Sequence, residues 1–178
     1  MRSFWIKVHL YLAAFFAPLL IIMAFSGGGY LLGFKGSVTV TPVELSVPAA
    51  LALDSADLAA AVREVLADND LVHEFEYVKV AGETVITRPT SRDYYAFDLS
   101  GQTIGVTLNQ PDFQKRLIEL HKGHGPLLFK DFQKFLAPGL LIMVISGLWL
   151  GLTSAMLRSS TLVTTGVGLL VFLILAFI

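Results

Sequence analysis

Long apolar segments, with one extended polar stretch between two of them, dominate this sequence. A transmembrane helix needs about 20 mostly apolar residues to cross roughly 30 Å of hydrocarbon. Three segments reach that length, and they are His9 to Phe34, Phe135 to Leu157, and Ser160 to Ile178. The pattern predicts a transmembrane helix within residues 1–34, a polar domain over 35–125, and two further spans within 126–157 and 158–178. The first span is expected to stay as an anchor, because it is too long for a signal-peptide core and lacks a small-residue cleavage site.

The polar domain begins with residues 35–53, which are expected to be irregular, with Pro42 and Pro48 separating short Val and Thr stretches suited to extended chain. A short helix is predicted from Ala56 to Ala67, with Asp54-Ser55 as its N-cap. Its apolar stripe consists of Leu58, Val62, Val65 and Leu66. One face of this helix should therefore pack on the rest of the domain.

Runs rich in β-branched and aromatic residues follow this helix and predict strands. They are His73 to Val80, Glu83 to Arg88, Asp93 to Leu99, and Gln102 to Leu108. A second amphipathic helix is expected from Asp112 to about Lys122, with Pro111 in its first turn and Gly123 at its end. The predicted fold is an α+β membrane protein, in which three transmembrane helices accompany a small helix-and-antiparallel-sheet domain placed between the first two.

Composition and charge agree with a membrane protein and suggest its orientation. Hydrophobic residues make up 54% of the chain and charged residues only 15%. Arg2 and Lys7 precede the first span and Arg158 lies between the second and third, whereas residues 35–125 carry 8 basic and 13 acidic residues, a net charge of −5. Because Lys and Arg are retained in cytoplasmic segments, we expect a cytoplasmic N-terminus and a middle domain on the outer side of the membrane.

Several kinds of active site are excluded or disfavoured by residue content. The chain has no cysteine, so disulfides, thiolate nucleophiles and Cys-ligated metals are excluded within it. Phosphate-binding Gly-rich loops, the nucleophile elbow of hydrolases and the His-Glu-x-x-His metal motif are also absent from the sequence. The acidic middle domain has no basic patch, which argues against nucleic-acid binding. Nothing in this content identifies an enzyme.

A repeated motif links the first two spans. Residues 16–27 and 136–147 are identical at seven of twelve positions, namely Ala17/Ala137, Pro18/Pro138, Leu20/Leu140, Ile22/Ile142, Met23/Met143, Ser26/Ser146 and Gly27/Gly147. Small residues allow close approach between membrane helices. We therefore expect the two spans to pack through small-residue surfaces, formed by Ser26, Gly27, Gly28, Gly29, Ser146 and Gly147.

Four segments of the chain follow one another in a characteristic order. They are Val8-His9-Leu10 through Ser26-Gly27, Tyr94-Tyr95-Ala96-Phe97-Asp98-Leu99-Ser100-Gly101-Gln102, the Leu120-His121-x-Gly123 elbow, and Ser146-Gly147-Leu148-Trp149-Leu150. In this order they resemble the PepSY-associated transmembrane family. The resemblance covers residues 4–151 and implies a bacterial inner-membrane protein with a periplasmic PepSY module. Larger relatives resemble iron-regulated reductases that carry haem b between transmembrane histidines.

Three histidines are the candidate ligands of a haem or metal: His9, His121 and His124. A membrane-embedded haem b generally needs two imidazoles at the same depth. His9 begins the first span while His121 and His124 precede the second, which places them about 30 Å apart across the bilayer at 1.5 Å per helical residue. A haem would therefore have to be shared with a second copy or a partner subunit. The alternatives are an interfacial anchor for His9 and a helix-ending turn for His121 and His124.

Three functions remain open from the sequence. The first is a non-catalytic accessory subunit of a larger respiratory or iron-related electron-transfer complex, in contact with membrane lipid and with other membrane subunits or a second copy. The second is a haem b electron-transfer or ferric-reductase-like protein, a membrane oxidoreductase. The third is a periplasmic module that restrains a peptidase.

Overall fold

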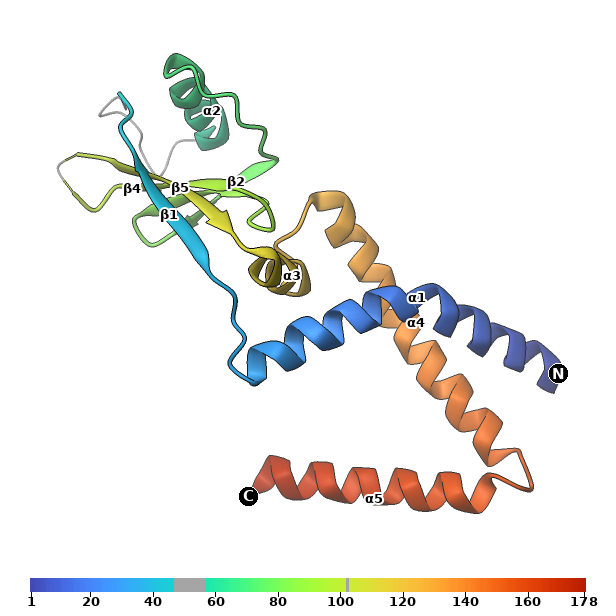
Figure 1. The fold of residues 1–178 in the computed structure, drawn as a ribbon. Coiled ribbons are helices and arrows are strands. Elements are labelled where there is room, and N and C mark those ends of the chain that lie inside the picture. The colour runs from blue at the N-terminus through green and yellow to red at the C-terminus, as the bar shows by residue number, and fades with distance from the viewer. Residues whose placement is uncertain (47–56, 102) are drawn as a thin grey trace. The chain divides into compact units, whose positions relative to one another are not determined.

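The computed structural model describes residues 1–46, 57–101 and 103–178 (Figure 1). Three of its helices are long and apolar enough to cross a membrane: α1 (Arg2–Leu31), α4 (Leu127–Leu152) and α5 (Arg158–Phe177). The chain is thus a membrane protein of α+β type. By its internal contacts it divides into two units, one formed by residues 1–20 with 134–178 and the other by residues 21–133.

Two of the long helices begin earlier than the apolar pattern predicts. α1 starts at Arg2 and α4 at Leu127, so both include polar residues before the apolar run. Long basic side chains such as Lys7 and Lys130 can lie along the apolar surface and carry their charge to the interface. Hydropathy therefore locates the membrane-crossing part of each helix but not its first turns.

The unit of residues 21–133 contains a five-stranded antiparallel sheet in the order β1-β5-β4-β3-β2 (Figure 1). The strands are β1 (Val38–Val43), β2 (Tyr77–Ala81), β3 (Thr84–Arg88), β4 (Tyr94–Asp98) and β5 (Gly105–Pro111). Four of the five overlap the predicted strands. β2 starts four residues later than expected, and β5 continues through Pro111, which was predicted to open a helix.

The expectation of an irregular segment over residues 35–53 is wrong for β1. Val38–Val43 pairs with β5 along its whole length, and Pro42 lies opposite Thr107. A proline is tolerated in an edge strand because its missing N–H can fall on the unpaired side. β1 is the edge of the sheet, so Pro42 does not prevent the strand. Pro48 lies outside the described residues.

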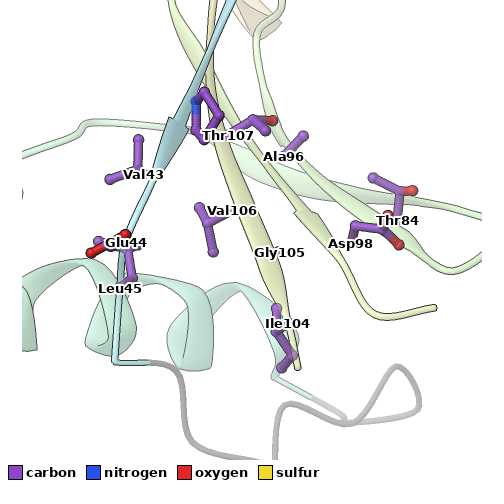
Figure 2. Close-up of a pocket in the computed structure, with 11 residues that line it drawn as sticks. Val43, Glu44, Leu45, Thr84, Ala96, Asp98, Ile104, Gly105, Val106 and Thr107 are labelled. Carbon is purple, nitrogen blue, oxygen red and sulfur yellow. The ribbon is translucent and has the colours of Figure 1, made fainter. Parts of the chain in front are cut away.

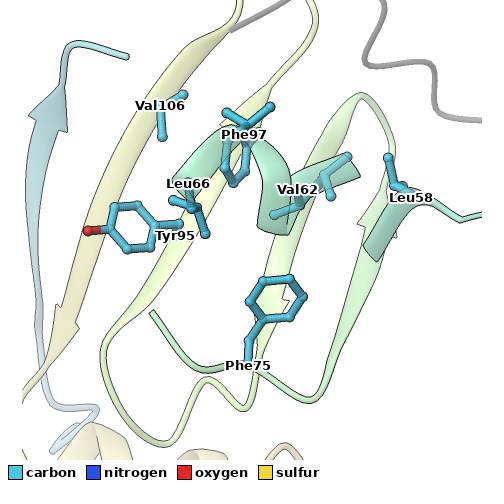
Figure 3. Close-up of a cluster of buried hydrophobic side chains, with 9 residues drawn as sticks. Leu58, Val62, Leu66, Phe75, Tyr95, Phe97 and Val106 are labelled. Atoms are coloured by element: carbon cyan, nitrogen blue, oxygen red, sulfur yellow. The ribbon is translucent and has the colours of Figure 1, made fainter. Parts of the chain in front are cut away.

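Helix α2 (Leu58–Asp68) covers one face of the sheet, as its apolar stripe predicts (Figure 3). All four predicted stripe residues are buried, and Val62 is fully enclosed together with Val85 and Phe97 of the sheet. The helix begins at Asp57, whose carboxylate accepts a hydrogen bond from the Ala60 N–H at 3.1 Å. The predicted cap, Asp54-Ser55, lies outside the described residues.

Helix α3 (Phe113–His121) joins the sheet to α4 and has defined caps at both ends. Asp112 accepts a hydrogen bond from the Lys115 N–H at 2.7 Å at its start. At its end, the Gly123 N–H donates to Leu120 O and the His124 N–H donates to Glu119 O, with Gly123 at φ +74°. This is the Schellman arrangement, which needs a left-handed residue best supplied by glycine. Gly123 thus ends the helix as predicted.

Candidate functional site

His9 of α1 is held by the repeated motif of α4, within the unit of residues 1–20 and 134–178. Its Nδ1 lies 3.0 Å from Met143 O and 3.1 Å from Ser146 Oγ. Ser146 is 1% exposed, and its hydroxyl donates to Met143 O at 3.0 Å. Because a carbonyl oxygen only accepts, the proton of the His9 ring must be on Nδ1. In the neutral ring, Nε2 then carries the free lone pair.

His121, at the end of α3, makes the same contacts with the other copy of the motif, within residues 21–133. Its Nδ1 lies 3.2 Å from Met23 O and 3.1 Å from Ser26 Oγ. Ser26 is fully buried and donates to Met23 O at 3.1 Å. The ring is therefore fixed as the same tautomer, with Nδ1 protonated and Nε2 free. In the described part of the chain, no hydrogen bond to Nε2 of either histidine is present.

The glycine of each motif lets the imidazole approach the helix backbone. A Cβ atom on Gly27 would lie 3.0 Å from His121 Cε1, and a Cβ atom on Gly147 would lie 3.0 Å from His9 Cε1. That separation is tighter than an ordinary van der Waals contact, so any larger residue would displace the ring. Each copy of the repeated Met-x-x-Ser-Gly motif thus forms a surface against which one imidazole packs.

The other glycines that were expected to mediate helix packing have different surroundings. A Cβ atom on Gly28 would meet nothing within 4 Å, and one on Gly29 would lie 3.0 Å from Gln114 Nε2. α1 comes close to α4 at Gly139, where a Cβ atom would overlap the Phe16 ring. Ring contact between Trp5 and Trp149, with centroids 5.9 Å apart, adds to the same helix pair. The repeat suggested mutual packing of its two copies, and what the structure places against each copy is a histidine.

His124 belongs to a separate polar cluster around Glu119. Its Nδ1 lies 2.7 Å from Glu119 Oε2, which also accepts a hydrogen bond from Thr90 Oγ1 at 2.8 Å. Arg88 Nη1 in turn donates to Thr90 Oγ1 at 2.7 Å. Since His121 contacts α1 and His124 contacts Glu119, these two rings serve different sites. In the residues that the structure describes, no three histidine or acidic side chains converge as a metal site.

The Glu119 carboxylate stays ionised although its side chain is only 9% exposed. Burial by itself would raise the pKa of Glu119. Hydrogen bonds from His124, Thr90 and Lys115, together with the Lys115 charge, outweigh burial and lower the pKa to about 2. A buried carboxylate with this many donors acts as the fixed centre of the elbow between α3 and α4.

More positive charge surrounds Glu119 than one carboxylate can neutralise. Lys115 Nζ lies 3.1 Å from Oε1, Lys122 Nζ 3.8 Å from Oε1, and Arg88 Nη1 3.9 Å from Oε2. The Arg88 side chain is buried, and its Nε has no hydrogen-bond partner in the described residues. Two units of positive charge therefore remain in excess at this end of α3.

The sequence did not reveal the Glu119 cluster, although it contained two signals for it. Glu119 directly follows Ile118 on the buried face of α3, and its spacing from Lys115 allows an i,i+4 pair. Arg88 and Thr90 come from the end of β3 and the turn after it, and only the fold brings them to α3. His73, expected to be exposed or packed, is packed: its ring lies edge-on to Tyr95 at 4.9 Å.

A hollow of about 610 Å³ lies at one end of the sheet, between β1, β4 and β5 (Figure 2). Its polar groups are the carboxylates of Glu44 and Asp98 and the hydroxyls of Thr84 and Thr107. The Asp98 carboxylate accepts a hydrogen bond from the Ser100 N–H at 3.0 Å. Among the lining residues that the structure describes, these groups do not form an acid–base pair beside a nucleophile.

Comparisons of the chain with protein-family models, with curated proteins and with solved structures gave no match.

Replacement of Glu119 by glutamine should loosen the elbow between α3 and α4. The variant leaves Arg88 buried without its counter-charge, and loss of one partner of a buried ion pair costs about 3 kcal/mol. We expect protection factors for hydrogen exchange over residues 119–127 to fall roughly 100-fold at pH 7. Glu64→Gln, on the exposed side of α2, is the matched control and should change nothing.

Hydrogen-exchange protection at the elbow should also depend on pH, and it should fall as the pH is lowered. The pKa of Glu119 is lower in the folded protein, about 2, than its usual value of 4.5, so its contribution is complete above pH 4.5 and is lost toward pH 2. Protection in the wild type should fall across that interval, while Glu119→Gln should remain flat. Equal acid sensitivity in both proteins would contradict the assignment.

Proposed function

We propose that the chain is a non-catalytic accessory subunit of a membrane electron-transfer complex, and that α5 is the helix through which it joins that complex. The observation that carries the proposal is the surface of α5. None of its 20 residues is buried, and only Thr161, which lies against Gly151 of α4, is partly covered. The electron-transfer setting rests on the resemblance to the PepSY-associated transmembrane family.

One face of α5 is suited to contact with another helix. Ser160, Thr164 and Gly168 are spaced four residues apart and share that face. Thr164 Oγ1 donates to Ser160 O at 2.7 Å, so its hydroxyl is satisfied within the helix. The result is a smooth, small-residue surface of the kind that membrane helices use to approach each other.

The partner contact should be lost when this face is filled. In Ser160→Leu/Thr164→Leu/Gly168→Leu, bulky side chains would hold a partner helix away, and interfaces of this type contribute about 1–2 kcal/mol. We expect the tagged wild-type chain, extracted from its native membranes in a mild detergent, to bring down a stoichiometric membrane partner. The triple variant should retain roughly a tenth of it or less.

The control for this experiment is Leu162→Phe/Leu173→Phe, which changes the opposite face of α5 and should leave the partner bound. A wild-type chain that purifies alone as a monomer would refute the proposal. Equal losses in the control and the triple variant would refute the assignment of the face.

The proposed location is the bacterial inner membrane, with the N-terminus in the cytoplasm and the sheet domain in the periplasm. Support comes from the basic residues beside the first span and at Arg158, and from the acidic net charge of residues 35–125. In this arrangement the PepSY-like sheet would cover or contact a periplasmic part of the complex.

Orientation can be measured directly because the chain has no cysteine. Glu83→Cys lies in the exposed β2–β3 turn, and Met156→Cys lies in the exposed α4–α5 connection. A membrane-impermeant maleimide should label the first in intact spheroplasts and the second only after permeabilisation. The reverse pattern would place the sheet domain in the cytoplasm.

A second candidate function is haem b binding, which the two imidazole sites favour. Histidines that ligate metals usually donate the other ring N–H to a carbonyl or carboxylate, which fixes the tautomer and raises the basicity of the ligating nitrogen. His9 and His121 both show that arrangement, with Nε2 left available. Bound haem would supply a one-electron carrier in the membrane. Each site offers one imidazole, so the second axial ligand would come from a second copy or from a partner subunit.

Visible spectra decide between the two candidates. If haem b is bound, membranes containing the chain should show split reduced-minus-oxidised bands, and His9→Ala or His121→Ala should remove the share of the signal due to each site. His73→Ala is the control, because His73 packs against Tyr95 within the sheet domain. Absence of the bands, or bands that survive both replacements, would exclude these histidines as axial ligands.

A further inference from the structure

A groove lies between the last turns of α1 and the end of α3, within the unit of residues 21–133. Its volume is about 370 Å³. Its lining is mostly apolar and consists of Ser26, Gly27, Tyr30 and Leu31 from α1 with Ile118, His121 and Lys122 from the α3 end. Leu31 is 85% exposed and continues the groove into the apolar surface of α1. The groove therefore extends from a polar end to a surface that faces hydrocarbon in a membrane.

Two lysines contact the ring of Tyr30, which lines the groove; Lys122 is itself a lining residue, whereas Lys35 is linked to the groove through this ring. Lys35 Nζ lies 5.5 Å and Lys122 Nζ 5.7 Å from the centre of the Tyr30 ring. Each contact is a favourable cation–π interaction. Because both ammonium groups lie near the same ring, an anion beside that ring would be attracted by both of them.

The acidic groups nearby do not supply that anion. Glu119 is the only acidic partner recorded for Lys122 in the described residues, and it is shared with Lys115 and Arg88. Lys35 has no carboxylate within ion-pair distance in the same part of the chain. The Asp112 carboxylate is already engaged by Ser37 and by the start of α3. The polar end of the groove thus carries unneutralised positive charge.

We infer that this groove binds an anionic phospholipid, with the phosphate beside Lys122 and the Tyr30 ring, where Lys35 also lies, and an acyl chain along the exposed side chain of Leu31. Basic pockets beside transmembrane helices recognise anionic headgroups by the same combination of charge and apolar surface. A free phosphate would use the lysines but would leave the apolar walls exposed. The inference does not depend on the proposed function, since a chain that recruits no partner would still carry the groove.

The test is lipid binding to the full-length, delipidated protein, measured by native mass spectrometry. Phosphatidylglycerol, phosphatidylcholine and inorganic phosphate are added separately. Each basic residue near a headgroup contributes about fivefold to anionic-lipid affinity. Phosphatidylglycerol should bind about 25-fold more tightly than phosphatidylcholine, and Lys35→Gln/Lys122→Gln should reduce its affinity to that of phosphatidylcholine.

The matched control is Lys79→Gln/Lys130→Gln, which removes the same charge from residues that neither line the groove nor contact the Tyr30 ring. It should retain the preference for phosphatidylglycerol. Equal binding of the two lipids by the wild type, or equal losses in both double variants, would overturn the inference. Displacement of phosphatidylglycerol by millimolar phosphate would show a free-anion site instead. Loss of haem absorption, rather than of lipid, in Lys35→Gln/Lys122→Gln would assign the lysines to a haem carboxylate and would also overturn it.

Discussion

The main constraint on this structure is that the imidazole rings of His9 and His121 must each pack against an apolar helix. An imidazole in apolar surroundings costs free energy unless its N–H finds an acceptor. In the two motifs the acceptors are a helix carbonyl and a serine hydroxyl, and a glycine opens the space for the ring. The same three residue types, a methionine, a serine and a glycine, contact His9 in one motif and His121 in the other. These contacts connect α1 to α4 in one unit and α3 to α1 in the other.

A second constraint acts at the elbow after α3, where ion pairs and hydrogen bonds to Glu119 hold the chain in place. Glu119 accepts hydrogen bonds or ion pairs from α3, from the turn after β3 and from the turn at His124, so one carboxylate joins three parts of the chain. The basic side chains around Glu119 outnumber it, and one of them, Lys122, also lines the groove between α1 and α3. The cluster around Glu119 thus also contributes positive charge to the groove in which we propose that a lipid binds.

Local sequence patterns identified most of the elements, whereas contacts between distant segments stayed hidden. The stripe of Leu58, Val62, Val65 and Leu66 identified α2 because its burial follows helical spacing. β1 was missed because Pro42 marks a break by local rules, and only pairing with β5 makes it an edge strand. The repeated Ser–Gly motif was visible in the sequence, but its histidine partners lie 95 and 137 residues from the serines. No local pattern connects residues that far apart.

Asp112 ties Ser37, the residue before β1, to the end of β5. Its carboxylate accepts from the N–H and the hydroxyl of Ser37, and its own N–H donates to Ser37 O at 3.0 Å. The next rung, Val38 opposite Pro111, is the first of the β1–β5 ladder. A force transmitted through α1 would peel β1 away from that end, one rung after another. The hydrogen bonds at Asp112 would have to break before that first rung, so they protect the β1–β5 ladder from being opened at this end.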